Sequence, residues 1–81
     1  MKVTIIGAGN LGLLLGAAFS IRGHEVTLRT SRPEQISKEI EIFNKEEEIL
    51  GIGKIARITA DWKESIEGAD VVWVTVPPQL F

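Results

Sequence analysis

The chain has 81 residues, of which 44% are hydrophobic and 25% charged, and its formal net charge is −2. This composition is average for globular domains in water, and the length allows one small domain with a limited core. The weak negative charge and the lack of a Lys/Arg cluster argue against nucleic acid as a partner.

The sequence contains no cysteine and a single histidine. Without thiolates there is neither a disulfide framework nor a cysteine zinc site, and one histidine cannot build a metal centre alone, so no metal site is expected. No stretch approaches the roughly 20 apolar residues that a membrane helix needs. We therefore expect a cytoplasmic protein with no membrane partner.

The first 30 residues predict one β-α-β unit. Residues 3–6 are β-branched and end at a glycine, which is typical of a strand buried in a parallel sheet. The Leu- and Ala-rich residues 10–22 predict the crossover helix, and Gly23 suits the left-handed position just past its end. Residues 25–30 alternate and predict a second, parallel strand.

The remaining residues continue the alternation of strands and helices. Pro33 suits the first position of a short helix over residues 34–38. Residues 40–50 fit helical spacing as well as a strand pair, and we expect a hairpin there. The last predicted elements are a strand over residues 55–59, a short helix from the Asp61 cap to Ile66, and a strand over residues 71–76.

A glycine-rich motif lies between the first strand and the first helix and reads Gly7, Ala8, Gly9, Asn10, Leu11, Gly12. Because it follows a buried strand and opens a helix, free backbone N–H groups and the positive helix end face an incoming anion. Gly7 permits a tight turn, Gly9 lets a phosphate approach, and Gly12 lets helix and strand pack closely. The motif predicts a site for the pyrophosphate of NAD or NADP, with a glycine-rich turn of another α/β domain as the alternative.

The fold class that this order of elements predicts is α/β, the first half of a doubly wound parallel sheet of the Rossmann type. About four parallel strands and an inserted hairpin are expected. Since a full dinucleotide fold continues with further strands, residues 1–81 are interpreted as the N-terminal part of such a domain, without its C-terminal substrate domain. Among the other residues, Gly16 is expected to ease helix–sheet contact and Trp62 to pack the short helix on the sheet.

The end of the second predicted strand bears on the choice between NAD and NADP. An Asp or Glu there would bind the ribose hydroxyls of NAD, but Thr30 and Ser31 stand between Arg29 and Arg32. A guanidinium beside a hydroxyl suits the 2′-phosphate of NADP, so the pattern favours NADP. The alternative is that one or both arginines are solvated loop charges. Pro77 follows the last strand, at the edge where ligands of open sheets bind.

The segments MKVTIIGAGNLG, RGHEVTL and EGADVVWVTVP together resemble the N-terminal domain of one superfamily. It includes opine (octopine/nopaline) dehydrogenases, glycerol-3-phosphate dehydrogenase and ketopantoate reductase. The resemblance covers essentially the whole chain, most loosely over residues 34–54. The GNLG turn and residues 55–61 resemble opine dehydrogenases most, whereas Pro77 replaces a lysine that serves the active site of ketopantoate reductases. Val76 and Pro77 followed by Gln79 are similar to a glycerol-3-phosphate dehydrogenase segment that lines the cofactor site.

The resemblance implies that the full-length parent, expected to be a homo-oligomer, transfers hydride from nicotinamide to an imine or ketone of a small acid. It places the pyrophosphate on residues 7–12, the adenosine end on Thr30, Ser31 and Arg32, and the nicotinamide ribose on Val76 and Pro77. Catalytic groups would come from later segments, so the 81 residues alone are expected to be inactive. A non-catalytic nucleotide-sensing module and a structural fragment with a vacant turn are the alternatives.

Overall fold

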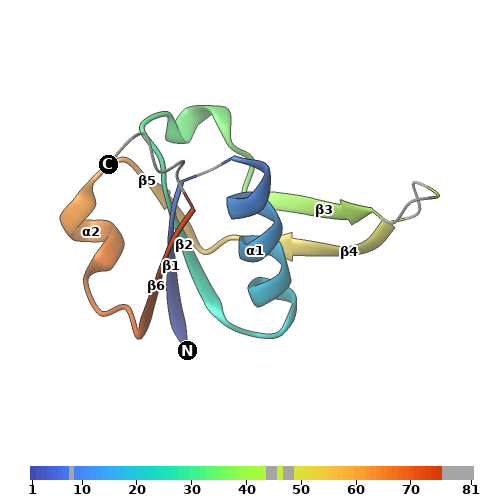
Figure 1. Cartoon of the computed structure of the whole chain (residues 1–81), viewed down its shortest axis with the longest axis horizontal. Helices are drawn as coiled ribbons and strands as arrows, with labels where there is room; N and C mark the ends of the chain where they lie inside the picture. The colour runs from blue at the N-terminus through green and yellow to red at the C-terminus, as the bar shows by residue number, and fades with distance from the viewer. Residues whose placement is uncertain (8, 44–45, 47–48, 76–81) are drawn as a thin grey trace.

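The structure is a computed structural model and describes residues 1–7, 9–43, 46 and 49–75. The elements within these ranges are β1 (Lys2–Ile6), α1 (Asn10–Ile21), β2 (Glu25–Arg29), the 3-10 turn η1 (Pro33–Gln35), β3 (Glu39–Phe43), β4 (Ile49–Lys54), β5 (Arg57–Thr59), α2 (Trp62–Ile66) and β6 (Val71–Val74) (Figure 1). Among these residues, no helix is long and apolar enough to cross a membrane.

Four strands form one parallel sheet in the order β5-β2-β1-β6. The chain moves outward from β1 through β2 to β5 and then crosses, through α2, to the other side of β1. This order confirms the predicted first half of a doubly wound fold. The register aligns Ile6 with Arg29 and with Val74, and Arg29 with Thr59, so the carboxyl ends of all four strands meet at one edge.

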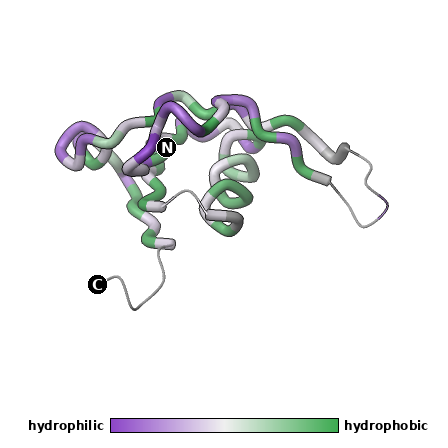
Figure 2. The backbone as a smooth tube through the Cα atoms, turned by 90° about the horizontal axis from the view of Figure 1, so that it is seen from above, coloured by the Kyte–Doolittle hydropathy of each residue, from purple (hydrophilic) through white to green (hydrophobic). Residues whose placement is uncertain are grey.

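The core lies on one face of the sheet, beneath α1. Its side chains are at most 3% exposed and are Val3, Ile5, Val26, Leu28 and Ile55. Gly16 of α1 faces this cluster, since a Cβ there would lie 3.3 Å from Ile55 and 3.5 Å from Leu28. The small residue lets the helix approach the sheet, as the sequence predicts. Helix α1 is largely apolar whereas α2 is mostly hydrophilic (Figure 2).

The antiparallel hairpin of β3 and β4 projects beside α1 (Figure 1). Gly53 is so close to the helix that a Cβ would lie 2.7 Å from the Cβ of Ala17. The Ser20 hydroxyl donates to the carbonyl of Lys54 at 2.6 Å and accepts from its N–H at 2.8 Å. The predicted hairpin is confirmed, although β4 ends at Lys54, four residues beyond the predicted end at residue 50. The strand predicted over residues 55–59 is shorter and forms β5 from Arg57 to Thr59.

Other predicted bounds are nearly right. Helix α1 ends at Ile21, and Gly23 adopts φ 92°, the predicted left-handed turn. Asp61 caps α2 through its Oδ1, which accepts from the Glu64 N–H at 2.8 Å. The helix predicted over residues 34–38 is wrong, because the backbone becomes extended at Ile36 and leaves only the short turn η1.

Candidate functional site

The glycine turn, residues 7–12, lies at the carboxyl end of β1. Gly7 has φ 109°, a backbone conformation that favours glycine. Its N–H donates to the carbonyl of Arg29 at 2.9 Å, which ties the start of the turn to β2. The chain then enters α1 through Gly9, the N-cap residue. Ala8, a predicted site residue, is outside the described ranges.

Gly9 leaves the N-terminus of α1 open. No heavy atom of the described residues, apart from its chain neighbours, lies within 4 Å of the position that a Cβ would take on Gly9, and none of their side chains caps the helix. The first helical hydrogen bond runs from the N–H of Leu13 to the Gly9 carbonyl at 3.0 Å. Because the N–H groups that precede it have no partner within a helix, they offer donors and partial positive charge to an anion.

Gly12 packs directly on the turn. A Cβ at this position would collide with the carbonyl oxygen of Gly7 and lie 2.9 Å from the Oγ1 of Thr75. Since the first contact is with backbone, no rotamer change relieves it. This is the close helix–strand packing that the motif predicts.

Thr75, directly after β6, contacts the turn from the other side. Its N–H donates to the Ile6 carbonyl at 2.9 Å, and its hydroxyl donates to the same oxygen at 3.0 Å. Thr75 is not among the site residues that the sequence predicts. The available signal was a hydroxyl residue at the carboxyl end of an otherwise apolar strand, immediately before Val76 and Pro77.

The 30–32 loop, which consists of Thr30, Ser31 and Arg32, follows β2 at the same edge of the sheet. The Thr30 N–H donates to the Thr59 carbonyl at 3.0 Å, and the Thr30 hydroxyl accepts from the Arg32 N–H at 3.3 Å. Thr30 is half-buried, whereas Ser31 and Arg32 are exposed. The loop is therefore held by its first residue and presents the other two to solvent.

Arg29 does not join this loop, although the sequence places it at its border. Its guanidinium lies over the ring of Trp62, 3.8 Å from the centroid, and its Nε donates to the Ala60 carbonyl at 3.2 Å. Trp62 is 54% exposed, and its ring contacts the sheet through Arg29 of β2, so it packs α2 on the sheet by this stacking contact and is not buried in the core. Of the two flanking arginines, Arg32 is the one whose charge is exposed beside the 30–32 loop.

Val76 and Pro77, the predicted contacts of the nicotinamide ribose, lie outside the described residues. The described part of the site thus consists of the open turn from Gly7 to Gly12, Thr75 behind it, and the 30–32 loop on the neighbouring strand. These segments meet at one edge because their strands are parallel and in register.

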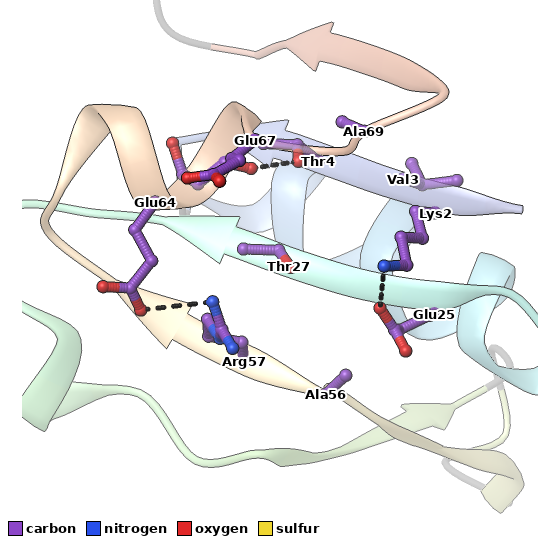
Figure 3. A pocket seen from close by; sticks show the side chains of 11 residues that line it. Lys2, Val3, Thr4, Glu25, Thr27, Ala56, Arg57, Glu64, Glu67 and Ala69 are labelled. Atoms are coloured by element: carbon purple, nitrogen blue, oxygen red, sulfur yellow. Dashed lines mark hydrogen bonds and ion pairs between the residues drawn. The ribbon is translucent and has the colours of Figure 1, made fainter.

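A cavity of about 220 Å³ lies on the other face of the sheet, between α2 and the strands (Figure 3). Its rim carries the ion pairs of Lys2 with Glu25 at 4.0 Å and of Arg57 with Glu64 at 3.4 Å. None of the described residues of the glycine turn lines it. These charges are paired with one another and lie away from the carboxyl edge of the sheet, where the glycine turn is.

A parallel sheet of this order, with an open glycine turn between its central strand and the following helix, defines a dinucleotide-binding domain of the Rossmann type. A family model described as the N-terminus of NAD-dependent glycerol-3-phosphate dehydrogenase matches residues 2–81. The chain belongs to this family.

Individual relatives agree with this assignment. A glycerol-3-phosphate dehydrogenase [NAD(P)+] of Bacillus velezensis is 33% identical over 78 residues, which are 94% of this chain and 23% of the relative. The enzyme of the same name from Acholeplasma laidlawii is 36% identical over 83 residues, 99% of this chain and 24% of the relative. A UDP-glucose 6-dehydrogenase of Rhizobium meliloti is 33% identical over 84 residues, which are 94% of this chain and 19% of the relative. No solved structure matches significantly.

The chain spans about a quarter of the length of the glycerol-3-phosphate dehydrogenases that it matches. Of the families that the sequence resembles, glycerol-3-phosphate dehydrogenase is thus better supported than opine dehydrogenase.

Proposed function

We propose that the chain holds the pyrophosphate of NAD or NADP on the glycine turn and is the cofactor-binding part of an oxidoreductase. The observation that carries this proposal is the open N-terminus of α1 at Gly9. The space beside Gly9 is unfilled by described atoms, and no described side chain caps the N–H groups of the first helical turn. A doubly charged linker fits there because no acidic side chain belongs to the first helical turn.

The bound cofactor supplies the hydride, and the residues of this chain bind and orient it. The single histidine, His24, is remote from the proposed site. Its Nδ1 lies 3.3 Å from the terminal amine of Met1, at the amino ends of the strands, whereas the turn is at their carboxyl ends. Since the chain spans about a quarter of its relatives, we propose that the general acid–base groups belong to the rest of the full-length protein, and we expect the chain alone to show no turnover.

We further propose that the 30–32 loop favours NADP over NAD. The loop carries no carboxylate that would accept hydrogen bonds from ribose hydroxyls. The exposed Arg32 lies next to Thr30 and Ser31, whose hydroxyls can share a phosphate with it. Arg29 is left out of this site because Trp62 and Ala60 hold its guanidinium.

For the full-length protein, we propose oxidation of glycerol 3-phosphate and the reverse reduction of the ketone, since the relatives carry that name. Reduction of an imine of the opine type is the second candidate, supported by the resemblance of the GNLG turn and of residues 55–61. Assays of the full-length protein with glycerol 3-phosphate and oxidised cofactor, and with an amino acid, a 2-oxo acid and reduced cofactor, separate the two. If neither set of substrates is turned over, the result favours a non-catalytic nucleotide-sensing protein. A homo-oligomeric, cytoplasmic parent stays a prediction.

Calorimetric titration of the folded chain with NADP and NAD, beside the variant Gly9→Val, tests cofactor binding. The Cβ of valine at residue 9 meets open space, so the variant should still fold, with a loss of stability of about 1 kcal/mol at this N-cap, while its side chain fills the place of the phosphate. We expect binding by the unchanged chain and none by the variant. Absence of binding by the unchanged chain, or equal binding by both, would contradict the proposal.

A further inference from the structure

We propose that Thr75 is a positioning residue for the glycine turn, because its hydroxyl fixes the peptide group from which the turn begins. This inference rests on the proposed function, since it concerns how the same turn is held ready for a pyrophosphate. Three contacts carry it: two hydrogen bonds to the Ile6 carbonyl and the approach of the hydroxyl to Gly12.

The peptide group that joins Ile6 to Gly7 is held from both sides. Its N–H donates to β2 through the Arg29 carbonyl at 2.9 Å, and its carbonyl accepts from β6 through the Thr75 N–H at 2.9 Å. These are the ladder bonds expected of a central strand. The Thr75 hydroxyl adds a second donor to the same carbonyl at 3.0 Å, so the last peptide plane of β1 is bonded more firmly than strand pairing alone requires.

The hydroxyl also contacts the helix that follows the turn. A Cβ on Gly12 would lie 2.9 Å from the Thr75 Oγ1, which means that the hydroxyl occupies the space beside the bare Cα of Gly12. One side chain therefore touches β1 before the turn and α1 after it. Since the direction of the helix N–H groups depends on how α1 sits on β1, this contact sets where the pyrophosphate donors point.

The substitutions at Thr75 separate the hydrogen bond from the shape. Valine keeps the branched shape but places a methyl group against the Ile6 carbonyl, and serine keeps the donor but loses the methyl group. Thr27→Val is the matched control, because it makes the same change in β2 on the side of the cavity, away from the turn.

The experiment is calorimetric titration of each folded variant with the dinucleotide that the unchanged chain binds more tightly, together with its melting temperature. We expect Thr75→Val to weaken binding by about three- to tenfold, the loss that follows from one hydrogen bond. Thr75→Ser and Thr27→Val should bind as the unchanged chain does. A merely structural role would lower the melting temperature but leave the affinity of the folded protein unchanged. That result, or a Thr75→Ser variant as weak as Thr75→Val, would overturn the inference.

A second measurement needs no variant, and it tests the role of Thr75 even if Thr75→Val does not fold. In an amide NMR titration, the resonance of Thr75 should shift along the same binding curve as those of Gly9 and Gly12, while that of Thr27 stays in place. A stationary Thr75 resonance during saturable shifts of the turn would refute the inference alone. If the unchanged chain binds no dinucleotide at all, the proposed function fails and the inference falls with it.

Discussion

The guanidinium of Arg29 lies 3.8 Å from the centre of the Trp62 ring, and this contact separates the two arginines that flank the 30–32 loop. Strand alternation puts the Arg29 side chain on the face of the sheet covered by α2, where its Nε also donates to the Ala60 carbonyl at 3.2 Å. Arg32 stays exposed beside Thr30 and Ser31. The two charges, three residues apart in the sequence, therefore have different roles.

Arg32→Ala is expected to lower the affinity for NADP by about five- to tenfold and to leave the affinity for NAD nearly unchanged, because the lost guanidinium would contact only the 2′-phosphate. Calorimetric titration with both dinucleotides measures the ratio of the two dissociation constants. Arg22→Ala, at an exposed arginine at the far end of α1, is the control. An equal loss for both cofactors, or no loss, would refute the role of Arg32.

Trp62→Leu is expected to lower the free energy of unfolding by about 0.5–1 kcal/mol, the usual size of an exposed cation–π contact. Urea denaturation of this variant, of Arg29→Ala and of the double variant forms a double-mutant cycle. The double variant should cost less than the sum of the single variants. Additive costs would show that the contact contributes nothing to stability.

Gly12→Ala is expected to destabilise the fold by about 1–3 kcal/mol, because its Cβ meets the Gly7 carbonyl and the Thr75 hydroxyl. Gly9→Ala, a matched change three residues earlier, places its Cβ in open space and should cost less than about 1 kcal/mol. Chemical denaturation compares the two. Equal losses of unfolding free energy for the two variants would contradict the close packing of α1 on β1 at Gly12.

Asp61→Ala is expected to cost about 1 kcal/mol of stability, since it removes the oxygen that accepts from the Glu64 N–H at 2.8 Å. Asp61→Asn keeps an acceptor at the same place and should lose much less. The measurement is again the urea midpoint. A loss as large for the asparagine variant would assign the effect to charge instead of capping.

Much of the fold follows from local patterns. Element boundaries are marked by backbone and capping requirements that act within a few residues. Gly7 marks the end of β1, Gly23 follows the end of α1, and Asp61 marks the beginning of α2. The parallel order then follows from the alternation of strands and helices. For the same reason, the glycine turn itself was visible in the sequence.

What the sequence did not show depends on contacts between distant residues. The Thr75 hydroxyl bonds a carbonyl 69 residues away, and Arg29 bonds one 31 residues away. Periodicity indicates which face a strand residue occupies but not which side chain of another element meets it there. The predicted helix after Pro33 failed for a related reason, because proline favours a first turn without deciding how far the helix continues.

The most direct test of the account is a crystal structure of the chain with NADP. We expect the pyrophosphate oxygens within about 2.7–3.2 Å of backbone N–H groups in the glycine turn, with the adenosine end toward the 30–32 loop. A dinucleotide bound instead in the cavity between Lys2 and Arg57, or a glycine turn that stays empty at saturating NADP, would contradict the account.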